Sequence, residues 1–180
     1  MSVEIEAKVK VGSHEAIAEE LGGSGAVLLA DIEQADIYYD FAQKSLTGSG
    51  KGMRIRRQKS AGIETVILTY KGKRQEGEYK IRPEHEVEVS DGQTLMDILD
   101  GIGLQKQLTV EKKRQMWQFN DCEVCLDDVA GLGAFVEVEG PSEATVKQTM
   151  KMLGLDGLKH IQDGYAKLLH KKAAGQSGDE

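Results

Sequence analysis

Alternation of apolar and charged residues with a period of two constrains the fold of this chain more than any other feature. From residue 3 to residue 10, every odd position is apolar and every even position is Glu or Lys. Because successive side chains of a strand point to opposite sides, this pattern predicts a strand with one apolar and one charged face. Further strands are predicted at residues 36–41, 52–58, 65–70, 84–89, 108–119, 123–128 and 134–139. Eight strands are enough to close a barrel.

Helical spacing is confined to residues 15–21, 94–102, 143–153 and 165–169, with Ser13 and Ser142 as predicted N-caps of the first and third segments. Amphipathic helices must cover an apolar surface, and the apolar strand faces are the natural target. The charged strand faces would then point inward. We therefore predict an α+β fold, in which an eight-stranded antiparallel β-barrel with a charged interior is flanked by a few amphipathic helices. One domain would span residues 1–170, followed by a polar, disordered tail at 171–180.

The charged faces carry acids and bases in sets. The acidic sets are Glu4-x-Glu6, Glu84-x-Glu86-x-Glu88 and Glu137-x-Glu139, and the basic sets are Arg54-x-Arg56, Lys71-x-Lys73 and Lys112-x-Arg114. Paired carboxylates are the hard oxygen ligands that Mg²⁺ or Mn²⁺ prefers, and Arg and Lys donate to phosphate oxygens. Together they predict a site for a metal–polyphosphate complex. A solvated outer face is the alternative for any single strand, and we assign Glu84 and Lys10 to solvent.

Other function classes are disfavoured. A net charge of −7 argues against non-specific nucleic-acid binding. The sequence has no run of about 20 apolar residues, and its N-terminus is charged rather than signal-like, so we expect a cytoplasmic protein with no membrane partner. Cys122 and Cys125 would point to opposite faces of one strand and remain free thiols. The Gly-rich residues 47–52 lack the Ser or Thr of a phosphate-binding loop and precede a strand, which favours a hairpin connection.

Several motifs occur in order along the chain. The first, Glu4-Ile-Glu6-Ala-Lys8, has the form E-x-E-x-K. It is followed by D-I-Y-Y-D at 36–40, G-x-x-M-R-I-R at 50–56, L-T-Y-K-G at 68–72, V-E-K-K-R at 110–114 and L-D-D-V-A-G-L-G-A-F-V-E-V-E at 126–139. By these motifs, residues 1–170 resemble the CYTH family, also called triphosphate tunnel metalloenzymes. Two departures from the family pattern are Lys73, where relatives often carry Pro, and Gly164 at the first position of the late S-Y-x-x-L-L motif.

The resemblance implies an eight-stranded tunnel with specific roles for its charged residues. The implied metal ligands are Glu4, Glu6, Asp127, Glu137 and Glu139, and the implied phosphate contacts are Lys8, Arg54, Arg56, Lys71, Lys112 and Arg114. Within this set, Glu4, Glu6, Lys8, Arg114 and Asp127 would be catalytic. Lys73, Glu86 and Glu88 are further candidates for lining the tunnel.

The resemblance also implies a triphosphate substrate and a divalent cofactor, Mg²⁺ or Mn²⁺. The motif spelling is most similar to class IV adenylate cyclases, which implies conversion of ATP to cyclic AMP and pyrophosphate. A tripolyphosphatase or a thiamine triphosphatase would use the same residues, and a non-catalytic module that binds polyphosphate or nucleotides is a third possibility. Two separate carboxylate clusters argue against that module, because anion binding alone would not require them. A homodimer is left open.

Overall fold

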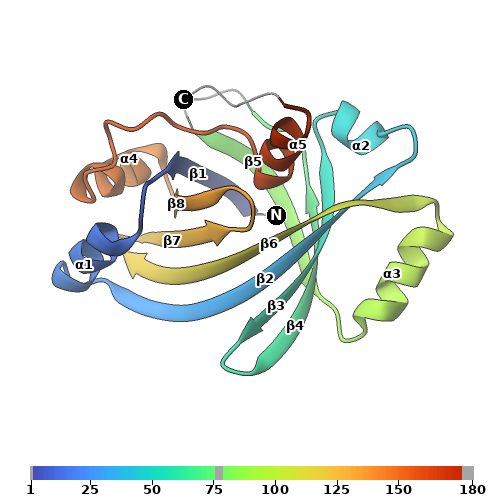
Figure 1. Ribbon diagram of the computed structural model, residues 1–180, viewed down its shortest axis with the longest axis horizontal. Coiled ribbons are helices and arrows are strands. Elements are labelled where there is room, and N and C mark those ends of the chain that lie inside the picture. The colour runs from blue at the N-terminus through green and yellow to red at the C-terminus, as the bar shows by residue number, and fades with distance from the viewer. Residues whose placement is uncertain (1, 76–78, 176–180) are drawn as a thin grey trace.

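The chain forms a closed antiparallel β-barrel (Figure 1). The computed structural model describes residues 2–75 and 79–175, with side chains from Ile5 onward. Within these residues the strands are β1 (Ser2–Lys10), β2 (Val27–Phe41), β3 (Gly52–Ser60), β4 (Ile63–Lys71), β5 (Lys80–Glu88), β6 (Leu104–Phe119), β7 (Cys122–Val129) and β8 (Gly133–Glu139). They close in the order β1-β5-β4-β3-β2-β6-β7-β8. The predicted fold class is confirmed.

The strands β2 and β6 are longer than their alternation predicts. They pair along almost their whole lengths, and the register shifts between Leu28 and Ala30 and again between Tyr38 and Tyr39. Such irregularities bend a strand and interrupt its period-two pattern. For this reason the first nine residues of β2 do not read as a strand, although pairing with β6 makes them one. Similarly, β5 begins at Lys80 rather than at residue 84.

Helices cover the apolar outer faces of the barrel. The helices α1 (Glu15–Gly23) and α4 (Glu143–Met152) pack against β1, β7 and β8, where Leu21 and Val146 join Val9, Val124 and Val138 in one core. On the other side, α3 (Gly92–Gly101) covers β2 and β3 through Leu99, Ile37 and Ile55. With these faces buried outside, the alternate residues point into the barrel, as predicted.

The helix ends agree with the sequence in part. Ser142 caps α4 by accepting a hydrogen bond from Thr145 N at 3.1 Å, as predicted. Ser13 is wrong as a cap, because α1 has His14 at the N-cap, where the ring nitrogen bonds Phe135 O at 3.0 Å instead of capping the helix. A short helix, α2 (Ser45–Gly48), was not predicted and lies in the β2–β3 connection.

The last helix closes one end of the barrel. Helix α5 (Tyr165–Ala173) extends into the segment assigned to the polar tail, whose residues 176–180 lie outside the described residues. Its apolar side packs with Val110, Val129 and Phe135, which belong to the inward faces of β6, β7 and β8. No helix in the described part of the chain has the length and apolar character needed to cross a membrane.

Candidate active site

The inward faces of the barrel bring together most of the predicted site residues. Lys8, Arg54, Lys112, Arg114 and Asp127 are all buried, although each is charged. Buried charges are costly unless they are paired. The interior is accordingly organised as two networks of ion pairs, one around Asp127 and one around Asp36.

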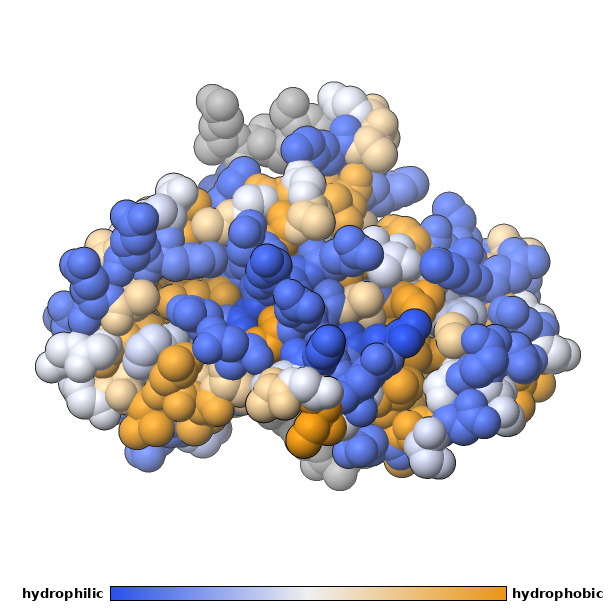
Figure 2. Space-filling view, turned by 60° about the horizontal axis from the view of Figure 1, so that its bottom comes forward, coloured by the Kyte–Doolittle hydropathy of each residue, from blue (hydrophilic) through white to orange (hydrophobic). Residues whose placement is uncertain are grey.

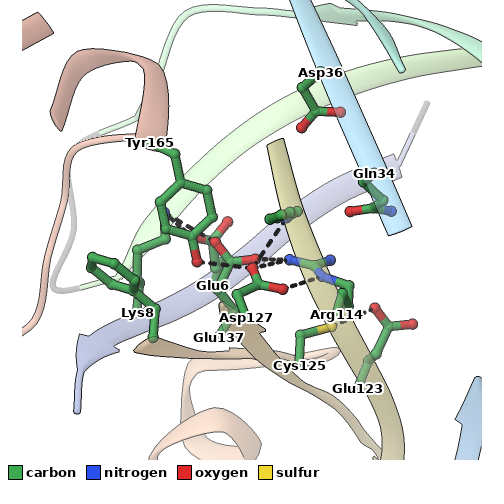
Figure 3. Close-up of polar contacts among 12 residues, drawn as sticks. Glu6, Lys8, Gln34, Asp36, Arg114, Glu123, Cys125, Asp127, Glu137 and Tyr165 are labelled. Carbon is green, nitrogen blue, oxygen red and sulfur yellow. Dashed lines mark hydrogen bonds and ion pairs between the residues drawn. The ribbon is translucent and has the colours of Figure 1, made fainter. Parts of the chain in front are cut away.

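Asp127 on β7 is the centre of the first network (Figure 3). Its side chain is 0% exposed. Arg114 donates to both carboxylate oxygens at 2.6 Å, Lys112 donates at 3.0 Å, and the Tyr165 hydroxyl donates at 2.9 Å. The antiparallel register places Arg114 directly opposite Asp127. Asp127 therefore fixes the orientation of two cations and of the first residue of α5.

Lys8 on β1 lies between two carboxylates. Its Nζ is 3.2 Å from Glu6 Oε1 and 3.1 Å from Glu137 Oε1, and the Tyr165 ring centroid is 4.3 Å away. Burial alone would lower the pKa of Lys8, but Glu6 and Glu137 outweigh it and raise that pKa. Burial would likewise raise the pKa of Glu137, yet Lys8, Arg114 and Lys112 hold it well below its usual range. Both groups are therefore ionised near neutral pH.

Two further ion pairs complete this network. Arg114 reaches Glu137 Oε2 at 2.5 Å, and Lys80 on β5 reaches Glu6 Oε2 at 2.5 Å. Lys112 differs from its neighbours, because burial, followed by repulsion from Arg114, lowers its pKa to about 8. Among the side chains that the structure describes, the first network therefore holds Lys8, Lys80, Lys112 and Arg114 against Glu6, Asp127 and Glu137.

Asp36 on β2 is the centre of the second network. Arg56 pairs with it through two hydrogen bonds of 2.6 and 2.9 Å, and Arg54 donates to it at 3.1 Å. Arg54 also reaches Glu86 Oε1 at 3.4 Å, and Thr69 Oγ1 donates to the same oxygen at 2.7 Å. Burial would raise the pKa of Asp36, but the two guanidinium groups hold it well below its usual range. Arg54 and Arg56 thus share one buried counter-ion.

The remaining predicted residues lie towards the edges of these networks. Glu84 was assigned to solvent, and this is wrong: it is buried and pairs with Lys71, because the β4–β5 register sets the two opposite each other. Glu139 is exposed and lies opposite Glu6 in the β1–β8 ladder. The other exposed side chains of the predicted set are Glu86, which is half-exposed, Lys73, Glu88 and, as predicted, Lys10. Glu4 lies on β1, but its side chain is outside the described residues.

Sequence reasoning missed several members of the interior. Asp36 and Tyr165 stand inside motifs that were recognised, D-I-Y-Y-D and the late Tyr motif, so their positions could have been flagged. Thr69 stands inside the recognised L-T-Y-K-G motif, and Lys80 forms a Lys-x-Arg doublet with Arg82, so both positions also carried a signal in the sequence. Cys122 and Cys125 are free and buried on opposite faces of β7, as predicted, and Cys125 belongs to the inward face.

The carboxylates fit a divalent metal that is held jointly with a substrate. No three His, Cys, Asp or Glu side chains within the described residues come together as a ready metal site. Glu6 Oε1 is nevertheless buried, and no described residue donates a hydrogen bond of normal geometry to it, although Lys8 Nζ lies 3.2 Å away. Mg²⁺ typically takes one or two protein carboxylates and fills its other positions with water and phosphate oxygens. Glu6 and Glu137 match that requirement.

Two hollows of about 510 and 480 Å³ lie along β2, β3, β6 and β7, and inward-facing residues line each in part: Gln34, Gln58 and Lys112 the first, and Arg114 the second. Both are lined by Glu33, Lys59, Lys113 and Asp128, which are exposed and alternate with the inward-facing residues. Figure 2 shows hydrophilic residues gathered across the middle of one face of the molecule. Mixed charges of this kind are typical of a solvated surface.

Comparison with known proteins agrees with this geometry. The sequence profile of the CYTH domain matches residues 2–165. The chain belongs to the CYTH family. Members of this family are enzymes that act on triphosphates, and the buried cations of the present barrel are suited to such substrates.

Individual CYTH relatives come from distant organisms. A Methanocaldococcus jannaschii protein, whose name marks it as a candidate adenylate cyclase, is 29% identical over 137 residues, covering 76% of each chain. Adenylate cyclase CyaB of Aeromonas hydrophila is 27% identical over 136 residues, or 75% of this chain and 67% of the relative. A solved structure from Pyrococcus horikoshii covers 94% of this chain and 99% of its own, with a TM-score of 0.83 and 28% identity.

The same fold occurs in a Hippeastrum protein described as having a dominant triphosphatase activity. It matches with a TM-score of 0.70 and 17% identity, covering 97% of this chain and 96% of its own. At this level of identity the likeness concerns the fold alone. The tunnel-shaped CYTH barrel is therefore shared by proteins with different reactions in their descriptions.

Proposed function

We propose that this protein is a divalent-metal-dependent enzyme that converts ATP to cyclic AMP and pyrophosphate. One observation carries the proposal: the barrel interior buries Lys8, Arg54, Lys112 and Arg114 together with the carboxylates Glu6 and Asp127, and Lys8 and Arg114 contact Glu137. Cations alone would bind any anion. Cations interleaved with carboxylates suit a triphosphate that carries a metal ion. The relatives named as adenylate cyclases support this choice of reaction.

In this proposal the basic side chains keep Asp36 and Asp127 as anchors and donate their remaining N–H groups to phosphate oxygens. Lys8, Arg54, Arg56, Lys71, Lys112 and Arg114 would hold the triphosphate, and Glu6 and Glu137, aided by Glu4 and Glu139, would hold Mg²⁺ or Mn²⁺. Asp127 would act mainly as the anchor that orients Lys112 and Arg114. When bound, the metal would polarise the phosphate oxygens and lower the pKa of the attacking hydroxyl.

The reaction itself is an internal displacement. The ribose 3′-oxygen forms a bond to the α-phosphorus, its proton goes to solvent, and the bond from the α-phosphorus to the bridging oxygen of pyrophosphate breaks. Negative charge accumulates on the leaving pyrophosphate. Fixed guanidinium and ammonium groups stabilise that charge without having to reorganise. Their rigidity here comes from the hydrogen bonds to Asp36 and Asp127.

Triphosphate hydrolysis is the second candidate. The charged interior grips phosphates in the same way whether the nucleophile is a ribose hydroxyl or water, and the Hippeastrum protein of the same fold has a dominant triphosphatase activity. Tripolyphosphate or thiamine triphosphate would then be the substrate. A binding module without turnover is the third candidate.

Product analysis separates the three candidates. The pure protein is incubated with ATP, tripolyphosphate or thiamine triphosphate in Mg²⁺ or Mn²⁺, and every product is identified by chromatography. Cyclic AMP with pyrophosphate supports the cyclase, whereas orthophosphate from tripolyphosphate with intact ATP supports the hydrolase. Binding without any product supports the module. EDTA should abolish turnover, and full activity in EDTA would remove the metal from the mechanism.

The same proposal includes a cytoplasmic location, an oligomeric state still to be measured and no binding to nucleic acid. A cytoplasmic location agrees with two free, buried cysteines. Size-exclusion chromatography with light scattering would decide between a monomer and a homodimer. An absence of retention on immobilised DNA and RNA at physiological salt is expected from the net charge of −7.

A further inference from the structure

Gln34 on β2 carries an unpaired buried oxygen inside the barrel. Its side chain is 5% exposed. The amide nitrogen donates to Gln58 Oε1 at 3.0 Å, but Gln34 Oε1 accepts no hydrogen bond from any residue that the structure describes. Figure 3 shows Gln34 on the same side of β2 as Asp36, facing Arg114. A buried amide oxygen without a partner destabilises the fold, so a donor from a ligand would be favourable here.

The position of Gln34 relates it to the phosphate-binding residues. Asp36, the anchor of Arg54 and Arg56, is two residues further along the same inward face, and Lys112 lies directly opposite Gln34 on β6. Beyond Asp36 the face continues to Tyr38, which packs into the apolar cluster closed by α5. A group attached to a triphosphate held between these cations cannot extend towards Tyr38. The side of Asp36 on which Gln34 lies is outside this cluster, and the group can extend there.

The chemistry of the unpaired atom narrows the ligand. An amide oxygen only accepts hydrogen bonds. The oxygens of a triphosphate near neutral pH are also acceptors, so the phosphate chain cannot satisfy it. A bare tripolyphosphate would leave Gln34 as it is. A ligand that satisfies this oxygen must carry a hydroxyl or amino donor close to its phosphates.

We propose that Gln34, held in place by Gln58, is a specificity-determining residue that accepts a hydrogen bond from a sugar hydroxyl of a nucleoside triphosphate. The inference rests on the proposed function, because it assumes a triphosphate between the buried cations. It adds a recognition element for the organic part of the substrate, which none of those cations provides. By this means the enzyme distinguishes a nucleotide from a bare phosphate chain.

The test compares two ligands in two isosteric variants. Dissociation constants for ATP and tripolyphosphate are measured by calorimetry in EDTA for the wild type, Gln34→Met and Gln58→Met, with Gln115→Met on the exposed outer face of β6 as the control. Loss of one neutral hydrogen bond of about 0.5–1.5 kcal/mol should weaken ATP binding by roughly 2- to 10-fold in Gln34→Met. Tripolyphosphate binding should stay within about 2-fold by the same reasoning. Gln58→Met should raise the ratio of the ATP dissociation constant to the tripolyphosphate dissociation constant in the same direction, but by less than Gln34→Met does.

The hydroxyl is then identified with 2′-deoxy-ATP and 3′-deoxy-ATP. The analogue that lacks the donor should bind the wild type more weakly than ATP does, and Gln34→Met should bind that analogue and ATP equally. Equal losses for ATP and tripolyphosphate in Gln34→Met, or an undiminished deoxy effect in that variant, would overturn the inference while leaving the phosphate site intact. A wild type that binds neither ligand, both in EDTA and with Mg²⁺ added, would instead overturn the proposed function, and the inference with it.

Thermal unfolding separates recognition from a structural role. Gln34→Met removes an unpaired buried oxygen but also the hydrogen bond to Gln58, and these effects oppose each other, so its melting temperature should stay within about 4 °C of that of the wild type. A melting temperature lower by more than about 4 °C, with both ligands affected alike, would mean that Gln34 serves the fold.

Discussion

Replacing Asp127 by Asn tests whether one buried carboxylate organises the basic half of the interior. Asp127 accepts four hydrogen bonds from Lys112, Arg114 and Tyr165 and is completely buried. Asn has nearly the same shape, but it carries no charge, and one of its two acceptor oxygens is replaced by a donor. Removing one partner of a buried ion pair costs about 3–5 kcal/mol, because the other charges remain buried without compensation.

The size of the effect can be expressed as a melting temperature. In a chain of this length, 1 kcal/mol corresponds to about 2–4 °C, so Asp127→Asn should lower the melting temperature by roughly 6–20 °C. Circular dichroism without ligand measures this shift. Asp128→Asn is the matched control, because Asp128 is the next residue on β7 and is exposed. Surface changes of this kind are usually within about 0.5 kcal/mol.

Tripolyphosphate provides an internal check on the reasoning. Its oxygens can accept the donors that Asp127 releases, so it should raise the melting temperature of Asp127→Asn more than that of the wild type. If Asp127→Asn and Asp128→Asn unfold within about 2 °C of each other, the ion network around Asp127 does not stabilise the fold. If tripolyphosphate stabilises both variants equally, the released cations do not face the phosphate site.

Three further predictions concern the same interior. Arg56→Ala should lower the rate or the triphosphate affinity on the order of 10²-fold, as expected for a charge-assisted contact inside the barrel. The exposed Lys59→Ala should change steady-state kinetics little, and equal effects of the two substitutions would place Arg56 outside the site. Turnover lost in EDTA should return on adding Mg²⁺ or Mn²⁺, measured by product formation, and no recovery with either ion would contradict their assignment. Lys112 has a pKa of about 8 in the fold and about 10.4 when unfolded, so between these values the unfolded chain binds more protons and the free energy of unfolding rises with pH. Urea unfolding at pH 7.5–10 should therefore show a smaller rise of this free energy in Lys112→Met than in the wild type. The same dependence on pH in both proteins would refute the pKa shift.

The alternation along the chain was sufficient to predict the architecture. It identified each strand of the barrel within a few residues at most ends, because a half-buried strand needs one apolar face whatever its neighbours are. Amphipathic helices then indicated which face points outward, and the structure confirms this in the packing of Leu21 and Leu99 against the barrel. The acid and base doublets followed from the same reasoning, and so did the interior position of Arg54 and Lys112.

The order of the strands and the register of their pairs could not be predicted in this way. A period of two indicates which residues share a face, but it does not give the register that sets residues of different strands opposite each other. For this reason Glu84 was assigned to solvent although Lys71 lies across from it. The first half of β2 was missed because a bulge interrupts its pattern, and only pairing with β6 makes it a strand.

The centre of the site depends on contacts across the whole chain. Tyr165 is 38 residues from Asp127, and Lys80 is 74 residues from Glu6, yet each pair forms a direct hydrogen bond inside the barrel. The sequence by itself determined that a set of cations and carboxylates would share the interior. Only the tertiary structure decided which cation pairs with which carboxylate, because barrel closure and the docking of α5 set those distances and local alternation does not encode them.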